Sequence, residues 1–365
     1  MKRTGPSLLQ LRRNFALEYL CAPMHVILTA AFIKLFGSYR QKVLFDQVRR
    51  RQHAFGILEA ADIAKRVGAK QVTVVEFGVA SGAGLMNLAQ ICEAVTKETG
   101  ISFRLIGFDV GKGLPSPIDY RDHPEMFQSG DYPMVNPDAL KNSLPSFASL
   151  IIGDVKETVP KFLEELDKES PIGYVVFDLD YYSSTVDALA IFEGDREEYL
   201  PVFWSYFDDV SGIWFNDWCG ELLAINEFNE KHRYRKLRLD HSLMARRVFK
   251  NAQWLSMVRS VHILDHPFRS IRSSAREAKV IGNTALGITS KLKLICSRSL
   301  EPVCLEKMNR KMTSARYVRF GSCGNIRLTR RKANHPGVNP TAATSQAAVG
   351  ETRESRRASQ AVPAS

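Results

Sequence analysis

Two stretches near the middle of the chain combine carboxylates with aromatic and hydroxyl side chains. YVVFDLDYYSST begins as an apolar run and then carries Asp178 and Asp180, and a later apolar run ends in YFDD with Asp208 and Asp209. If both runs are neighbouring strands of a parallel sheet, their carboxyl ends meet at one edge of it. Several ionised carboxylates converge only beside a compensating cation. A hard divalent ion such as Mg²⁺ prefers oxygen ligands and would lower the pKa of a substrate hydroxyl bound to it.

A glycine-rich turn follows the first apolar run, VTVVEF. The turn reads EFGVASGAG, from Glu76 to Gly84, and a helical pattern begins there. Its glycines let the backbone approach a ligand, and the new helix offers unpaired N–H groups. Asp109 ends the next strand, where an acid can accept both hydroxyls of a ribose. The residues predicted to bind a nucleoside cofactor here are Glu76, Gly78, Ser81, Gly82, Gly84 and Asp109.

The spacing of these residues narrows the identity of the cofactor. The glycines depart from the GxGxxG of dinucleotide-binding turns, and the GK[ST] of phosphate-binding loops is missing from the turn. Glu76 would repel a pyrophosphate but suits a nucleoside that carries positive charge, and S-adenosylmethionine has both an ammonium and a sulfonium. EFGVASGAG, the acid at the second strand end and GDVKETVP after the third strand together resemble the class I S-adenosylmethionine-dependent methyltransferases.

The two acidic stretches add a narrower resemblance. They are similar to the DxDxYxST and DD motifs of the macrocin O-methyltransferase (TylF/MycF) family, over about residues 70–250. The resemblance implies metal-assisted O-methylation of a hydroxyl on a small sugar or polyol-like molecule. The residues that it implies are Asp178, Asp208 and Asp209 as ligands of Mg²⁺ or another divalent cation, Asp180 as general base, and Asp154 near the adenine.

Other interpretations of these residues stay open. The aspartates would also suit helix N-caps, Asp180 beside Ser183 or Ser184 and Asp154 before the helix at residue 156. A methyltransferase without a metal, acting on N, S or C, is the alternative within the same fold. His123 and His241 are expected to be packed or solvent-facing rather than catalytic. Trp214 and Trp218 would suit either the core or an aromatic wall beside the substrate.

Apolar runs alternate with helical patterns along most of the chain. This alternation predicts an α/β, Rossmann-like class I methyltransferase sandwich whose seven-stranded sheet is mostly parallel and ends in an antiparallel hairpin. The expected strands are 72–77, 103–109, 148–154, 173–180, 202–209, 234–239 and 242–249, with the last two in the hairpin. The expected helices are 84–98, 156–168, 184–199 and 219–232, after a helical region within 6–67.

The expected domain organisation has three parts. An N-terminal helical region covers 1–67, the methyltransferase domain covers 68–266, and a basic, mostly disordered tail covers 267–365. Within the domain, 111–147 is rich in Pro, Gly, Asp and aromatic residues. A connection of that length is usually functional, so we expect it to cap the strand ends, with one helix near 136–144.

The net charge of +11 comes from the tail. Residues 267–365 hold 19 Lys+Arg and 5 Asp+Glu, whereas residues 1–266 hold 31 and 34. A nearly neutral domain does not indicate nucleic-acid binding. The alternative from another functional class is a membrane-associated or nucleic-acid-binding protein that uses the basic tail, where RLTRRK at 327–332 would allow a weak polyanion contact. The six scattered cysteines favour reduced thiols and a cytoplasmic protein. The apolar segment 16–36 is too interrupted to span a bilayer. It predicts a packed helix, with peripheral membrane contact or a homo-oligomer contact as alternatives.

Overall fold

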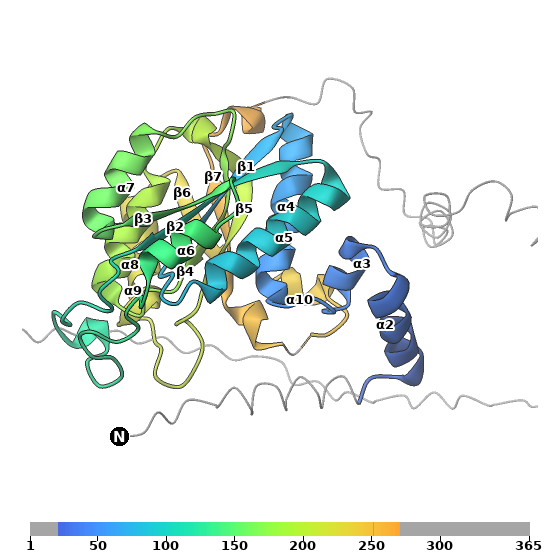
Figure 1. Cartoon of the computed structure of the whole chain (residues 1–365), viewed down its shortest axis with the longest axis horizontal. Helices are drawn as coiled ribbons and strands as arrows, with labels where there is room; N and C mark the ends of the chain where they lie inside the picture. Colours follow the sequence, from blue (N-terminus) through green and yellow to red (C-terminus); the bar gives the residue numbers. More distant parts are fainter. Residues whose placement is uncertain (1–20, 251, 271–365) are drawn as a thin grey trace, which may run out of the picture. The chain divides into compact units, whose positions relative to one another are not determined.

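A seven-stranded sheet forms the centre of the molecule (Figure 1). The computed structural model describes residues 21–250 and 252–270. The strands are β1 (Gln71–Phe77), β2 (Ser102–Asp109), β3 (Ala148–Ile152), β4 (Ile172–Phe177), β5 (Tyr199–Phe207), β6 (Arg235–Leu239) and β7 (Val258–Ile263). Their order is β3-β2-β1-β4-β5-β7-β6, and only β7 runs antiparallel to the other six strands. The predicted fold class is therefore confirmed.

Helices cover both faces of this sheet. On one side lie α4 (Arg51–Val67) and α5 (Ala83–Thr99), and on the other lie α7 (Val155–Glu164), α8 (Tyr182–Leu189) and α9 (Gly220–Lys231) (Figure 1). Because the sheet is covered on both faces, the central strands are mostly apolar, and every residue of β4 is buried. The chain reverses its direction of travel across the sheet between β1 and β4, so the carboxyl ends of these strands border the ligand-binding edge.

Four phenylalanines stack side by side near that edge. Phe108, Phe77, Phe177 and Phe207 occupy register-matched positions on β2, β1, β4 and β5. Neighbouring ring centroids lie 4.9, 5.3 and 4.5 Å apart, and all four side chains are buried. Because each ring ends its strand or immediately precedes the strand's last residue, the residues that follow emerge together at the same edge.

The insertion after β2 is folded onto the domain. It contains η1 (Tyr120–Asp122) and α6 (Pro137–Ser143). Asp122 is buried and accepts hydrogen bonds from the backbone N–H of Ser183 at 2.8 Å, the Ser183 hydroxyl at 3.0 Å and the N–H of Ile118 at 2.8 Å. One carboxylate thus ties the insertion to the first turn of α8.

The prediction of a strand at residues 242–249 is wrong. Residues 242–249 form α10 (Leu243–Arg246) and a loop, and the antiparallel partner of β6 is β7, which lies between β5 and β6 rather than at the sheet edge. The side chains of 242–249 serve another purpose: Arg247 is buried against Asp46 and the carbonyl of Val43. An apolar run that anchors the N-terminal helices has the same composition as a strand, which explains the error.

The N-terminal helices differ from the expected packed segment. Besides α4 they are α2 (Met24–Phe36) and α3 (Tyr39–Leu44), which begins with a capping box at Ser38. In α2 only Ala30 and Ile33 are buried, so the prediction of a packed helix over 16–36 is wrong for its described part. Within 21–250 and 252–270, no helix has the length and apolarity required to cross a membrane.

Several expectations concern residues outside the described ranges. They are the helical pattern within 6–20, the tail from 271 onward with its RLTRRK segment, and Cys296, Cys304 and Cys323. Of the described cysteines, Cys21 is exposed, Cys92 is buried and Cys219 is intermediate, and all three are free thiols.

We predict that Asp122→Ala will lower the free energy of unfolding by about 2–4 kcal/mol, because it leaves three partly buried donors without their acceptor. Urea unfolding followed by circular dichroism measures this. Asp138→Ala, on the exposed first turn of α6 in the same insertion, should cost less than about 1 kcal/mol. Equal effects of the two substitutions would contradict the anchoring role of Asp122.

Candidate active site

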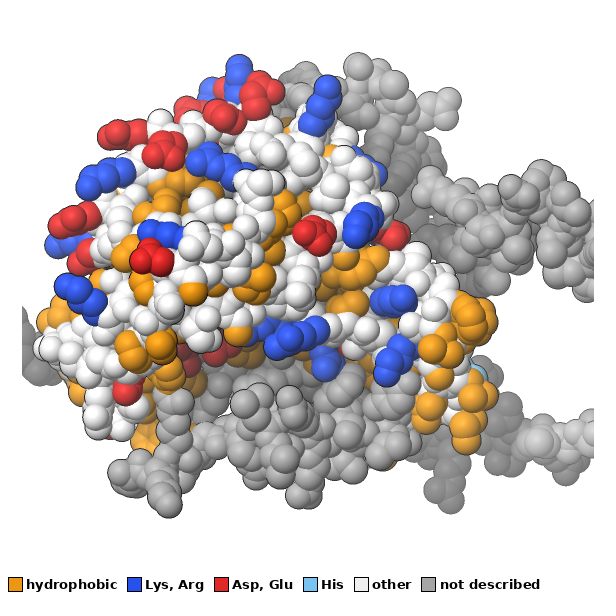
Figure 2. Space-filling view, viewed as in Figure 1, with side chains coloured by type: hydrophobic (Ala, Val, Ile, Leu, Met, Phe, Trp, Pro, Cys, Tyr) orange, Lys and Arg blue, Asp and Glu red, His pale blue; other side chains and the backbone are white. Residues whose placement is uncertain are grey.

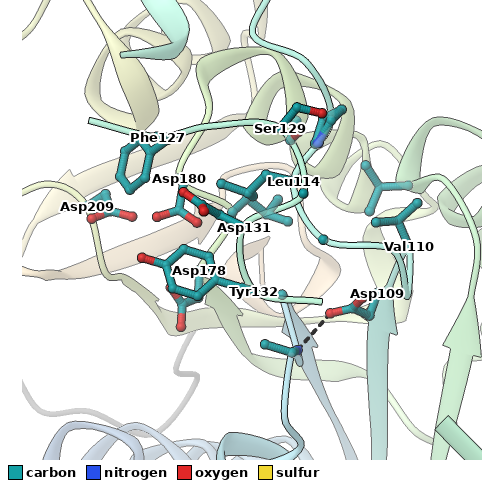
Figure 3. Close-up of a pocket in the computed structure, with 18 of the residues that line it drawn as sticks. Asp109, Val110, Leu114, Phe127, Ser129, Asp131, Tyr132, Asp178, Asp180 and Asp209 are labelled. Atoms are coloured by element: carbon teal, nitrogen blue, oxygen red, sulfur yellow. Dashed lines mark hydrogen bonds between the residues drawn. The ribbon is translucent and has the colours of Figure 1, made fainter. Parts of the chain in front are cut away.

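A cavity of about 1200 Å³ lies over the carboxyl ends of the central strands. Its walls come from the residues that follow β1, β2, β4 and β5 and from the 111–147 insertion. Figure 3 shows Asp178, Asp180 and Asp209 on one side of this space and Asp109 on the other. The predicted site residues that line it are Gly78, Asp109, Asp154, Asp178, Asp180, Asp208 and Asp209.

The glycine-rich turn is shaped by close contacts. A Cβ at Gly78 would lie 1.8 Å from the carbonyl oxygen of Asp178, and its φ of +81° also favours glycine. A Cβ at Gly84 would lie 2.2 Å from the Oε1 atom of Glu76. The absence of side chains here lets β1 approach β4 and lets the start of α5 pass over Glu76. Gly82 and Gly84 are buried behind the cavity wall, while Ser81 is exposed and does not line the cavity.

Glu76 is a buried carboxylate beneath this turn. Glu76 is 3% exposed, and its Oε2 atom has no hydrogen-bond partner among the described residues. Burial raises the pKa of Glu76 to about 8; Arg50, at the start of α4, lowers it, and Asp109 raises it further. A buried carboxylate oxygen without a partner is costly, so this position favours a ligand that brings a hydrogen-bond donor or a positive charge. Glu76 itself is not among the residues that line the cavity.

Asp109 is held in place by two backbone groups. Its Oδ2 atom accepts a hydrogen bond from the N–H of Ala80 at 2.7 Å, which is the dashed line in Figure 3, and its Oδ1 atom accepts one from Gly111 at 2.6 Å. These bonds join the ends of β1 and β2 and turn the carboxylate toward the cavity. Each oxygen keeps a second lone pair, so the group can still accept the hydroxyls of a ribose.

The acids that follow β4 and β5 form a cluster. Asp178 and Asp208 both face the cavity, and the Tyr206 hydroxyl donates to Asp208 Oδ1 at 2.6 Å. Enclosure by the protein raises the pKa of Asp178 well above its usual range, and the charges of Asp208 and Asp180 raise it further. The structure therefore brings together the strand-end acids that the sequence places 30 residues apart.

Glu221 is a member of this cluster that sequence reasoning missed. It lies in the first turn of α9, is fully buried, and accepts a hydrogen bond from the N–H of Asp209 at 3.1 Å through Oε2. Its Oε1 atom and the Oδ2 atom of Asp209 are buried without a partner among the described residues. Burial raises the pKa of both groups, and the charge of Glu221 raises that of Asp209 further. The hydrogen bond from the Asp209 N–H lowers the pKa of Glu221, whereas the charges of Asp178, Asp208 and Asp180 raise it. The sequence signal that could have identified Glu221 is its position among the apolar residues of GELLAINEF.

The donor set suits a hard divalent ion, because it consists of carboxylates with unfilled oxygens. The spacing of these side chains is not that of a formed metal site, however. Within the part of the chain that the structure describes, no three His, Cys, Asp or Glu side chains are placed to hold a metal ion. The predicted ligands Asp178, Asp208 and Asp209 thus share one wall without closing a coordination shell.

The helix-cap alternatives separate clearly. Asp154 is the N-cap of α7 and accepts a hydrogen bond from Lys156 at 3.0 Å while also lining the cavity. Asp180 does not cap α8. The N-cap of this helix is Tyr181, which makes no side-chain capping hydrogen bond, and the backbone N–H of Ser183 donates to Asp122 instead. Asp180 is buried with φ at +63°, a left-handed conformation that aspartate tolerates better than most residues.

The aromatic and histidine candidates also divide. Trp214 lines the cavity together with Phe215, whereas Trp218 is exposed away from it. His123 is buried, packs edge-on against Phe215 with ring centroids 5.7 Å apart, and contacts Glu125 through Nδ1 at 3.0 Å. His241 is exposed. Neither histidine lines the cavity, as expected for packed and solvent-facing residues.

The insertion supplies lining residues that the sequence did not single out. Phe127, Asp131 and Tyr132 reach the cavity from it, and Figure 3 shows Asp131 beside Asp180. Lys112 and Leu114 line the same space after β2. A loop has no regular periodicity from which to predict which side chains point inward. Its composition therefore indicated only that the segment as a whole would line the site.

Several solved methyltransferase structures are similar to this chain. The calicheamicin methyltransferase CalS11 has 20% sequence identity over 71% of this chain and 94% of that protein, with a TM-score of 0.42. MycE from the mycinamycin biosynthetic pathway, in complex with Mg, SAH and mycinamycin VI, has 13% identity over 59% of this chain and 57% of its own, with a TM-score of 0.31. A putative caffeoyl-CoA O-methyltransferase from Staphylococcus aureus has 9% identity over 70% of this chain and 99% of its own, with a TM-score of 0.32.

No protein-family model matches the sequence, and no curated protein matches it either. The similarity to these structures concerns the fold. The fold assignment rests on the observed strand order.

We predict that Glu76→Gln will stabilise the ligand-free protein increasingly as the pH rises. The pKa of Glu76 is about 8 in the folded protein against 4.5 as a reference. Between these values the unfolded chain releases a proton that the folded protein keeps, so the contribution of Glu76 to stability falls as the pH rises through this window. Glutamine does not ionise and so removes this loss of folding free energy, which is at most about 5 kcal/mol.

Urea unfolding of both proteins near pH 5 and near pH 9 measures the difference. Glu93→Gln, on the exposed side of α5, is the matched control and should show no such pH dependence. A difference between Glu76→Gln and the parent protein that stays constant with pH would contradict a buried, proton-holding Glu76.

Proposed function

We propose that this protein is an S-adenosylmethionine-dependent methyltransferase that acts on a hydroxyl of a small molecule, of the sugar or polyol class. The observation that supports it most is the shared cavity. This one space connects Asp109 at the end of β2 with Asp178, Asp180, Asp208 and Asp209 after β4 and β5. A methyl donor and an acceptor must meet in one water-poor space, aligned for direct displacement at carbon.

The cofactor would occupy the β1–β2 side of the cavity. Glu76, with its unpartnered Oε2 atom beneath the glycine turn, would attract the ammonium of the methionine moiety. Asp109, fixed by Ala80 and Gly111, would accept the ribose hydroxyls. Asp154 lines the cavity beyond β3 and is our candidate beside the adenine. This arrangement points the donor methyl toward the cluster of aspartates.

The acceptor would lie between that cluster and the insertion. Asp178, Asp208 and Asp209 would hold Mg²⁺ or another divalent ion, which would lower the pKa of the hydroxyl to be methylated. Asp180 would take the proton, a task within reach of an ordinary carboxylate when the hydroxyl is already acidified. Phe127, Tyr132, Trp214 and Phe215 would form the apolar walls that orient the acceptor and exclude water.

A metal-independent methyltransferase acting on N, S or C is the second candidate. It uses the same cofactor side of the cavity as the first candidate and requires no divalent ion. Chelation separates the two candidates, because only the first depends on a divalent ion.

We expect S-adenosylmethionine to bind the full-length protein with micromolar affinity, measured by calorimetric titration. Asp109→Ala should weaken binding at least about tenfold, a loss of about 1.4 kcal/mol, since the ribose hydroxyls lose their acceptor. The exposed Asp138→Ala is the control and should bind like the parent protein. Thermal melting of each variant confirms that it is folded. Absence of binding heat at several temperatures in the parent protein would contradict the cofactor assignment.

We expect Asp208→Asn and Asp178→Asn to reduce methyl transfer at least about a hundredfold while S-adenosylmethionine binding changes little. Transfer of a labelled methyl group to a panel of polyhydroxylated acceptors measures the activity, and calorimetry measures cofactor binding. Excess EDTA should abolish transfer, and added Mg²⁺ should restore it. Full activity in EDTA would exclude the metal-assisted mechanism and favour the second candidate.

A further inference from the structure

The helix α2 carries an apolar stripe on its exposed side. Met24, Leu28, Phe32, Leu35 and Phe36 are 63–74% exposed, and their spacing of three and four residues places them along one face. In Figure 2 a group of hydrophobic side chains, in orange, lies over α2 (Figure 1) at the lower right of the molecule. Only Ala30 and Ile33 of this helix are buried. Soluble proteins rarely leave a contiguous apolar surface of this kind without a binding partner.

The charged residues of the segment that carries the stripe are of one sign. The segment 19–45 contains no Asp or Glu, whereas it contains Lys34, Arg40 and Lys42. Arg40 pairs with Asp62 at 2.6 Å, but Lys34 and Lys42 take part in none of the ion pairs found among the described residues. Over residues 1–45 the sequence has seven Lys or Arg and a single acid, Glu18. Figure 2 shows blue side chains directly beside the apolar group.

We propose that the α2 stripe binds the surface of a membrane that contains anionic lipid, with the helix axis along the surface. An apolar face flanked by Lys and Arg is the arrangement of helices that lie in the headgroup region. The 13 residues of α2 span about 20 Å, too short to cross the hydrocarbon core, so the helix lies on the membrane rather than through it. This inference does not depend on the proposed catalytic function.

Charge argues against a second copy of this chain as the partner. Two α2 stripes packed face to face would bring basic residues near basic residues, with no acid in 19–45 to pair with them. The negative surface of an anionic bilayer complements the same residues. An anionic lipid surface therefore matches both the apolar stripe and the basic residues beside it.

Vesicle co-sedimentation of the full-length protein tests the proposal. The parent protein should bind vesicles of phosphatidylcholine mixed with phosphatidylglycerol more strongly than vesicles of phosphatidylcholine alone. The double variant Leu28→Gln/Phe32→Gln keeps the charge but loses two of the exposed apolar side chains, and it should lose at least about tenfold in affinity. Lys34→Gln/Lys42→Gln should lose the preference for the anionic vesicles.

The matched control is Leu264→Gln/Phe268→Gln, which removes two exposed apolar side chains after β7 and should bind vesicles like the parent protein. Full vesicle binding by Leu28→Gln/Phe32→Gln would overturn the proposal and assign binding to another part of the chain. Failure of the parent protein to bind either vesicle would overturn it too. Light scattering in solution adds the last outcome: a parent dimer that the same variant converts to monomer would identify a second copy as the partner.

Discussion

The in-register stacking of four phenylalanines is the contact on which the rest of the site depends. Phe108, Phe77, Phe177 and Phe207 lock the ends of four parallel strands at one level, with ring centroids 4.5–5.3 Å apart. A slip of one residue in any strand would turn its ring to the other face of the sheet. Because Asp109, Asp178 and Asp208 directly follow three of these rings, the same packing delivers all three acids to one edge.

This placement is costly for the folded protein and useful for a ligand. Carboxylates that repel one another, with unpartnered oxygens on Glu76, Asp209 and Glu221, destabilise the site in the absence of a compensating group. Such strain is tolerated because the surrounding sheet is apolar and well packed. Groups held in unfavourable electrostatic environments are characteristic of functional sites, which is why we place the chemistry at this edge.

The insertion completes the site by contacts that cross the domain. Asp122 ties it to the first turn of α8, whose N-cap is Tyr181 rather than Asp180. The helix α4 contributes in a similar way, since Arg50 at its start is the positive charge that acts on both Glu76 and Asp178. Part of the cavity wall and part of its charge balance thus come from segments that are remote in sequence from the acids after β4 and β5.

Six of the seven strands, β1 to β6, could be predicted from the sequence alone, as could the main helices that connect them, the glycine turn and the acids at three strand ends, whereas β7 was missed. These features rest on local patterns: apolar runs, helical periodicity and an acid that follows a phenylalanine. Periodicity failed at 242–249, where an apolar run packs Arg247 against the N-terminal helices instead of forming a strand. Only the tertiary structure decided the roles of Glu221, Asp122 and Arg50 and the exposure of α2, because burial and charge pairing depend on which distant segments pack together.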